Sequence, residues 1–217
     1  AMTSRIVARA RPSLAVWAGI AAAITFGLGP VWWEQTTVAE VYALHNLLVA
    51  AVLFVAVDLE NRSGAALDRR IALLFFLVGL GLAHHRTIVL LAPGLAIYLL
   101  WAVPGIWRPR RMWLWWGLAL LAPLLLYLYM PLRSVMGAGD LHGSYANTWR
   151  GFWDHVLARG YTSFFSTNAL SVDRSPSDWL ALWLAQSGWL GMILSAIGLL
   201  WLLDRHTRKA VMLITVV

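Results

Sequence analysis

The sequence contains no cysteine among its 217 residues and has few charged side chains. Without cysteine it can form no disulfide framework, thiolate nucleophile or cysteine-based metal site. Charged residues make up 12% of the chain, about half of their share in a soluble domain, whereas hydrophobic residues make up 60%. So few charges cannot supply the polar shell of a soluble fold. The composition therefore predicts an all-α, polytopic integral membrane protein.

Long apolar runs set the predicted topology. A helix that crosses the hydrocarbon core needs about 20 apolar residues. We predict a single membrane domain over residues 1–217, with a long loop at 132–179 and spans at about 14–33, 38–57, 71–83, 88–103, 112–131, 180–203 and from 210 to 217. The third and fourth runs are short, and the intervening sequence HHRT (84–87) is too polar to face lipid. We expect these two runs to form a hairpin.

The 17 Lys and Arg residues are divided unevenly between the two predicted sides. If every run crosses, 12 basic and 4 acidic residues lie on one side, and 5 basic and 6 acidic residues lie on the other. The first side then carries 12 − 4 = +8 and the second 5 − 6 = −1. Because basic loops stay in the cytoplasm, the 132–179 loop is expected to be extracytoplasmic. The net charge of +7 thus reflects topology, and we expect no nucleic-acid partner.

The long loop contains a predicted amphipathic helix. Asn147 or Thr148 can cap its start, and its apolar residues recur at helical spacing, at Trp149, Phe152, Trp153 and Val156. Because tryptophan favours the membrane–water interface, we expect the segment 149–159 to lie along the membrane surface. Ser175 is expected to cap the following span, with Asp178 completing a capping box.

Ionisable residues at membrane depth are costly and need a structural or functional reason. Glu34, Glu40 and His45 either bond neighbouring helices or belong to an external-facing site, and the sequence leaves both open. No Ser-His-Asp order, glycine-rich phosphate loop or acidic pair is evident in the sequence. Spacing alone therefore identifies no catalytic constellation.

The basic cluster between the two short runs is either an interfacial loop that happens to be basic or a group that binds a lipid phosphate. His84 and His85 are a poor metal pair, because adjacent side chains on a helix point about 100° apart. Arg86 can instead give two hydrogen bonds to a phosphate group, and a histidine can add a third. Arg133, after the fifth run, either reaches to the headgroups or joins this cluster.

The segment GPVWWEQTTVAEVYAL (29–44) resembles the bacterial protein O-mannosyltransferase-like family, whose members are similar to GT-C class membrane glycosyltransferases. GLGLAHHRT (79–87), YLYMPLRS (127–134) and the loop segment 148–161 also match the family pattern. The resemblance covers most of the chain. It implies transfer of a sugar such as mannose from a polyprenyl-phosphate carrier to an acceptor of unknown kind. The reaction would take place on the non-cytoplasmic face of a bacterial inner membrane, and no metal or cofactor is evident.

The resemblance also implies roles for particular residues. The lipid phosphate would be bound by His84, His85, Arg86 and Arg133. The acceptor or sugar would contact the external loop at Trp149, Trp153, His155 and Arg159.

One expected family feature is absent from these residues, an acidic motif of the Asp-Ser-Gly-Glu kind in the first external loop. The catalytic residue is therefore unknown, with Glu34 and Glu40 as supporting candidates. We expect the chain to be an internal part of a longer protein whose general base lies upstream, and to be inactive by itself. The alternative is a transporter or non-catalytic membrane subunit, in which Glu40 and His45 form a proton or ion path. An acidic pair in a preceding external loop would favour the transferase.

The charge asymmetry generates a prediction about topology. In intact cells, a cysteine replacing Ser144 in the long loop should react with a membrane-impermeant maleimide, because that loop is predicted to lie outside. A cysteine replacing Ser63, on the basic side, should react only after the cells are permeabilised. The reverse labelling pattern would refute the orientation.

Overall fold

A computed structural model describes residues 2–37, 41–107, 111–139, 145–161 and 173–216. Every regular element within these ranges is a helix, which confirms the all-α prediction. Three helical stretches are long and apolar enough to cross a membrane: Tyr42–Asn61, Met112–Val135 and Pro176–Arg205. The chain is an integral membrane protein whose helices differ in detail from the predicted spans.

The first predicted span, 14–33, is broken in the structure. After α1 (Met2–Ala10), α2 covers Pro12–Gly27 and α3 covers Pro30–Thr37. The break falls at Gly29–Pro30, because proline restricts the residue before it and cannot donate a backbone hydrogen bond. Gln186 packs against this break, since a Cβ added at Gly29 would lie 1.9 Å from its Nε2. Residues 30–33, the end of the predicted span, therefore belong to a separate helix that continues to Thr37.

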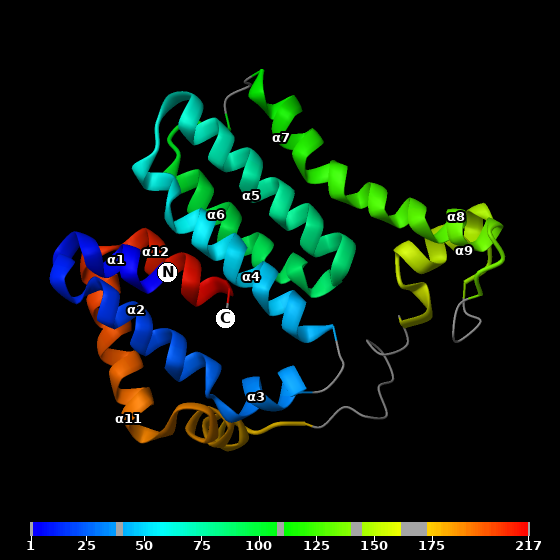
Figure 1. Cartoon of the computed structure of the whole chain (residues 1–217). Coiled ribbons are helices and arrows are strands. Elements are labelled where there is room, and N and C mark those ends of the chain that lie inside the picture. The colour runs from blue at the N-terminus through cyan, green and yellow to red at the C-terminus, as the bar shows by residue number, and fades with distance from the viewer. Residues whose placement is uncertain (1, 38–40, 108–110, 140–144, 162–172, 217) are drawn as a thin grey trace.

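The two short predicted runs form a helical hairpin. Helix α4 (Tyr42–Val57) and the 3-10 turn η1 (Leu59–Asn61) lead into α5, which spans Gly64–His84 and so begins seven residues before the predicted 71–83. The chain turns at His85 and returns through η2 (Arg86–Leu91) and α6 (Ala92–Ala102) (Figure 1). The turn is closely packed, because a Cβ on Gly81 would lie 2.7 Å from the side chain of Ile88.

The second half of the chain forms one long rod, a loop helix and two terminal helices. The rod contains α7 (Met112–Leu121), η3 (Ala122–Leu128) and α8 (Tyr129–Val135), and it extends toward the right of Figure 1. The loop then contributes α9 (Trp149–Val156) and η4 (Arg159–Tyr161). Helices α11 (Pro176–Arg205) and α12 (Thr207–Val216) complete the chain. The predicted capping box of Ser175 and Asp178 is present at the start of α11.

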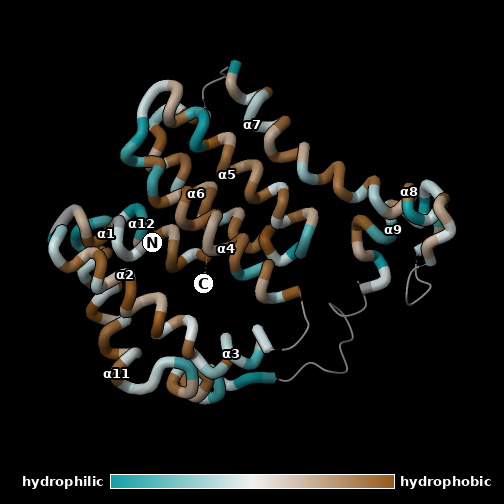
Figure 2. The backbone as a smooth tube through the Cα atoms, viewed as in Figure 1, coloured by the Kyte–Doolittle hydropathy of each residue, from teal (hydrophilic) through white to brown (hydrophobic). Residues whose placement is uncertain are grey.

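The buried core lies where α4, α5, α6 and α12 meet. Its fully buried side chains include Val52, Ile71, Leu74, Ile88, Tyr98 and Met212. Helix α11 has a different environment: none of its most apolar 18-residue window is buried, although it is rich in Leu, Ile and Trp. Figure 2 shows the same apolar character along α7 and α2. Such exposed apolar surface requires an apolar solvent, which the bilayer supplies.

The segments that the charge rule assigns to one side lie together in the structure. In Figure 1, α1, η1, the start of α7 and the α11–α12 junction lie at the top and left, away from α8 and α9. An ion pair joins two of them directly, since Lys209 of α12, with a side chain 3% exposed, donates to Glu60 of η1. Beside it, buried Asp58 accepts from Arg62 and, at 2.6 Å, from Arg70. Several of the basic residues therefore hold the ends of helices together.

Close helix contacts depend on small residues. A Cβ on Gly79 of α5 would lie 2.1 Å from the backbone oxygen of Leu120 in α7, so the two helices touch there through their backbones. A Cβ on Gly94 of α6 would lie 3.0 Å from the carbonyl of Met212 in α12. Small residues at membrane helix contacts allow this approach, which gains van der Waals packing.

The contact at Gly79 can be tested by a single methyl group. Gly79→Ala should destabilise the protein by about 1–3 kcal/mol, because α5 and α7 must move apart to accept it. Gly117→Ala is the matched control, since a Cβ there meets nothing within 4 Å and alanine favours a helix. Thermal unfolding in detergent measures both. Equal stability of the two variants would contradict the packing.

Candidate functional site

The polar residues at one end of the bundle gather around the turn of the hairpin. Helix α5 ends at His84, and His85 is extended, with φ −148° and ψ 124°. This break in helical geometry sends the side chains of His84, His85 and Arg86 to three different neighbours. The three residues predicted as one cluster are therefore adjacent in the chain, but their side chains bond to different groups.

His84 bonds to the start of α4, and Thr87 bridges His85 to His45 of α4. His84 Nε2 lies 3.0 Å from the carbonyl oxygen of Val41. Thr87 Oγ1 lies 2.7 Å from His85 Nδ1 and 3.0 Å from His45 Nε2, and the two imidazole centroids are 4.9 Å apart. A threonine hydroxyl has one proton, so when it donates to one ring the other ring donates to it. Thr87 thereby fixes the arrangement of both rings.

Arg86 connects the hairpin to the long loop at 132–179. Its Nε donates to the carbonyl oxygen of Val156 at 3.0 Å, and its Nη2 lies 2.6 Å from the carbonyl oxygens of both His155 and Val156. These are the last carbonyls of α9, which have no partner within the helix. A guanidinium at a helix C-terminus also interacts favourably with the helix dipole.

Helix α9 needs such support at its end. It begins as predicted with Thr148, whose Oγ1 accepts from the Gly151 N–H at 3.0 Å. It ends at Val156 rather than near residue 160, because Ala158 adopts a left-handed conformation with φ 48°. This conformation costs an alanine roughly 1–2 kcal/mol and is usually left to glycine. Contacts around the helix end, including those of Arg86, hold it there.

Arg133 lines a polar hollow of about 350 Å³ at the end of α8. The hollow is also lined by His155 of α9 and by Tyr145, whose ring meets the His155 ring edge-on at 5.8 Å. The other lining residues are Tyr129, Met130, Ser134, Ala138 and Gly139. The rod that carries Arg133 is tied to the hairpin, because Tyr127 Oη donates to the Leu82 carbonyl oxygen at 3.0 Å. His155 therefore links the two arginines. Its backbone carbonyl oxygen accepts from Arg86, and its ring lines the same hollow as Arg133.

The remaining predicted site residues lie on α3, on α9 and η4, or outside the described residues. Glu34 is exposed on α3, and Glu40 falls outside the described ranges. Trp149 is 78% exposed on α9 and contacts the half-buried Trp153 edge-on. Arg159 donates to Asp154 at 2.8 Å, and Arg150 pairs with the same carboxylate at 3.6 Å. Sequence reasoning did not identify Thr87 or Tyr145, because only the turn and the fold of the loop bring them to the site.

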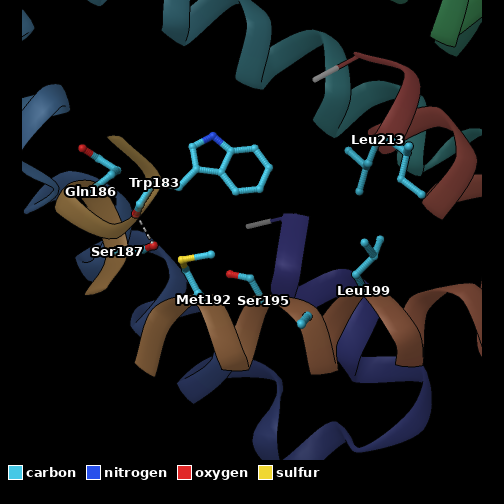
Figure 3. A pocket seen from close by; sticks show the side chains of 9 residues that line it. Trp183, Gln186, Ser187, Met192, Ser195, Leu199 and Leu213 are labelled. Carbon is cyan, nitrogen blue, oxygen red and sulfur yellow. Dashed lines mark hydrogen bonds between the residues drawn. The ribbon is translucent and has the colours of Figure 1, made fainter. Parts of the chain in front are cut away.

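A second, larger hollow lies between α11 and α12 and has a different character (Figure 3). It measures about 810 Å³ and forms where Gly188, with φ +64°, bends α11 into two halves. Trp183 and Gln186 line it from the first half, Leu199 from the second and Leu213 from α12. Within the described part of the chain, none of the residues that line it is ionisable, in contrast to the hollow of Arg133 and His155.

The fold and the site together define a polytopic α-helical membrane protein with one polar, cationic site at an end of the bundle. Residues 3–104 match the TMEM260 N-terminal domain of protein O-mannosyl-transferase. Over 155 residues the chain is 31% identical to protein O-mannosyl-transferase TMEM260 of Mus musculus, an alignment that covers 67% of this chain and 21% of the mouse protein. Over 209 residues it is 26% identical to protein O-mannosyl-transferase tmem260 of Dictyostelium discoideum, covering 86% of this chain and 25% of that protein. No solved structure matches the chain.

The chain contains the TMEM260 N-terminal domain and is a distant homologue of protein O-mannosyl-transferase TMEM260, a GT-C-like membrane glycosyltransferase. This confirms the family relation inferred from its motifs. The chain spans about a quarter of the length of these curated relatives, or slightly less.

The threonine between the two histidines provides a structural prediction. Thr87→Val keeps the shape of the side chain but leaves His45 Nε2 and His85 Nδ1 without their shared partner. It should lower the free energy of unfolding by about 1–3 kcal/mol. Thr87→Ser retains the hydroxyl and serves as the control. If valine and serine variants unfold at the same temperature in detergent, the hydroxyl does not bridge the rings.

Proposed function

We propose that this chain supplies the lipid-phosphate site of a membrane glycosyltransferase. The enzyme transfers mannose from a polyprenyl-phosphate carrier to an acceptor hydroxyl on the non-cytoplasmic face of the membrane. The observation that carries the proposal is the hollow shared by Arg133 and His155 at one end of the bundle. The names of the homologues support both the reaction class and the sugar.

The reaction explains why a cation is needed at this point. The acceptor oxygen attacks the anomeric carbon of the sugar, and the bond from that carbon to the phosphate oxygen breaks. Polyprenyl phosphate leaves with the electron pair of the broken bond, and the proton of the acceptor hydroxyl passes to a general base. Negative charge therefore grows on the phosphate, and a fixed guanidinium stabilises it more in the transition state than in the ground state.

The position of Arg133 suits a lipid-linked donor. Its side chain is exposed at the end of a rod, Met112–Val135, that is long and apolar enough to cross the membrane. A carrier whose isoprenoid tail lies in the bilayer presents its phosphate at that depth. The guanidinium lies 6.0 Å from the centroid of the Tyr129 ring, which restricts its orientation.

The other predicted residues take supporting places in this proposal. His155 can donate a hydrogen bond to a phosphate or sugar oxygen within the same hollow. His84 and His85 would add positive potential from the adjoining turn when protonated. Trp149, exposed on α9, offers a flat apolar face for a sugar ring. The general base is not among the groups assigned to the hollow, and Glu34 and Glu40 remain its supporting candidates.

The proposal predicts a large effect of one arginine. In the full-length gene product, Arg133→Ala should reduce mannose transfer from polyprenyl-phosphate mannose by roughly ten- to a hundredfold. This range corresponds to about 1.5–3 kcal/mol for one charge-assisted contact. Arg150→Ala is the matched control, because Arg150 is an exposed arginine of the same site region that pairs only weakly with Asp154.

Transfer is measured with purified protein in bilayer discs and radiolabelled donor. Equal losses in both variants would show that Arg133 has no special role. Transport of the lipid-linked sugar without its consumption would favour the transporter alternative.

A further inference from the structure

We infer that Arg86 is a positioning residue, which holds helix α9 so that His155 reaches the hollow of Arg133. The inference rests on the proposed function and assigns Arg86 a role different from the direct phosphate contact predicted from the sequence. Its Nε and Nη2 are both engaged by backbone carbonyls of the loop helix, Nη2 by two of them.

Arg86 contacts the C-terminal end of α9, where the helix is poorly terminated. The carbonyl oxygen of His155 accepts from Arg86 and also from the N–H of Ala158, the residue with φ 48°. A helix of eight residues ending in a left-handed alanine is short and poorly terminated. The guanidinium gives the His155 carbonyl oxygen a second donor and donates twice to the carbonyl oxygen of Val156.

The carbonyl and the side chain of His155 face different partners. The carbonyl is bound by Arg86, whereas the imidazole meets Tyr145 and lines the hollow of Arg133. Fixing the backbone at this residue therefore sets where its ring can lie. A shift of about 1 Å in such a group is enough to lower a reaction rate strongly.

This contact requires the planar guanidinium group of arginine, whose nitrogens form a fork. Two nitrogens of one planar group reach two successive carbonyls, whereas a lysine ammonium is a single point charge. Arg86 also follows directly on the His84–His85 turn of the hairpin. Its bonds thus connect the membrane-embedded hairpin to the external loop.

A double-mutant cycle separates positioning from direct phosphate binding. In the full-length gene product, Arg86→Gln and His155→Ala should each lower kcat/KM for polyprenyl-phosphate mannose. If Arg86 acts through His155, the double variant should lose no more activity than the worse single variant. If Arg86 binds the phosphate itself, the two losses should multiply, and the inference is wrong. Arg86→Lys separates the charge of Arg86 from its geometry, because lysine keeps the charge but lacks the forked guanidinium. Its kcat/KM should be as low as that of Arg86→Gln if the forked contact is required.

Docking of the loop can be measured without any transfer reaction. In the full-length gene product, with any other cysteine replaced, a single cysteine at Val156 should react faster with a maleimide when Arg86→Gln is added, because α9 is released. Arg150→Gln should leave the labelling rate unchanged. Unchanged labelling with Arg86→Gln would overturn the inference. If the wild-type protein transfers no sugar at all, the proposed function fails, and the labelling still decides whether Arg86 holds the loop.

Discussion

The hydrocarbon core offers no hydrogen bonds, and this constraint governs where the chain can leave helical geometry. Breaks at Gly29–Pro30, His85 and Gly188 lie near apolar helices, and each has its own local provision. At Gly29–Pro30 the side chain of Gln186 accepts from the Val31 N–H at 2.9 Å, supplying an acceptor at the start of α3. At His85 the backbone N–H still donates to the Gly81 carbonyl oxygen. At Gly188 the break falls on a glycine, the residue that adopts positive φ without strain.

The same constraint divides the polar groups between the two ends of the bundle. At one end, carboxylates and basic residues neutralise one another, as in the pairs of Asp58 with Arg70 and Glu60 with Lys209. At the other end Arg150 and Arg159 share the carboxylate of Asp154, but two further arginines are engaged differently. Arg86 is held by backbone carbonyls, and Arg133 lies against a tyrosine ring. Among the described residues that line the hollow of Arg133 none is a carboxylate, so this guanidinium can attract an anion more readily than one paired with a carboxylate. The difference between the ends is the physical basis for placing the site beside Arg133.

The position of α9 in the long loop depends on its contacts with the helical hairpin. Helix α9 is short, amphipathic and strained at its end, so its position depends on what it contacts. Those contacts come from the hairpin turn, which is itself held by the Thr87–histidine network. Arg86 of the hairpin therefore fixes the position of His155, which lines the hollow. A loop positioned by a rigid scaffold in this way can carry functional residues.

The sequence by itself determined the solvent, the fold class and the family. Its long apolar runs can be buried only in lipid, and its caps at Thr148 and Ser175 act within a few residues, so both were predictable. Tertiary structure decided which polar groups meet. The sequence grouped His84, His85 and Arg86 because they are adjacent, but the extended backbone at His85 sends them to three neighbours. It could not pair Arg86 with carbonyls some 70 residues away, nor bring His155 to Arg133. Such contacts depend on how the rod, the hairpin and the loop pack together, and this packing cannot be predicted from the spacing of residues in the sequence.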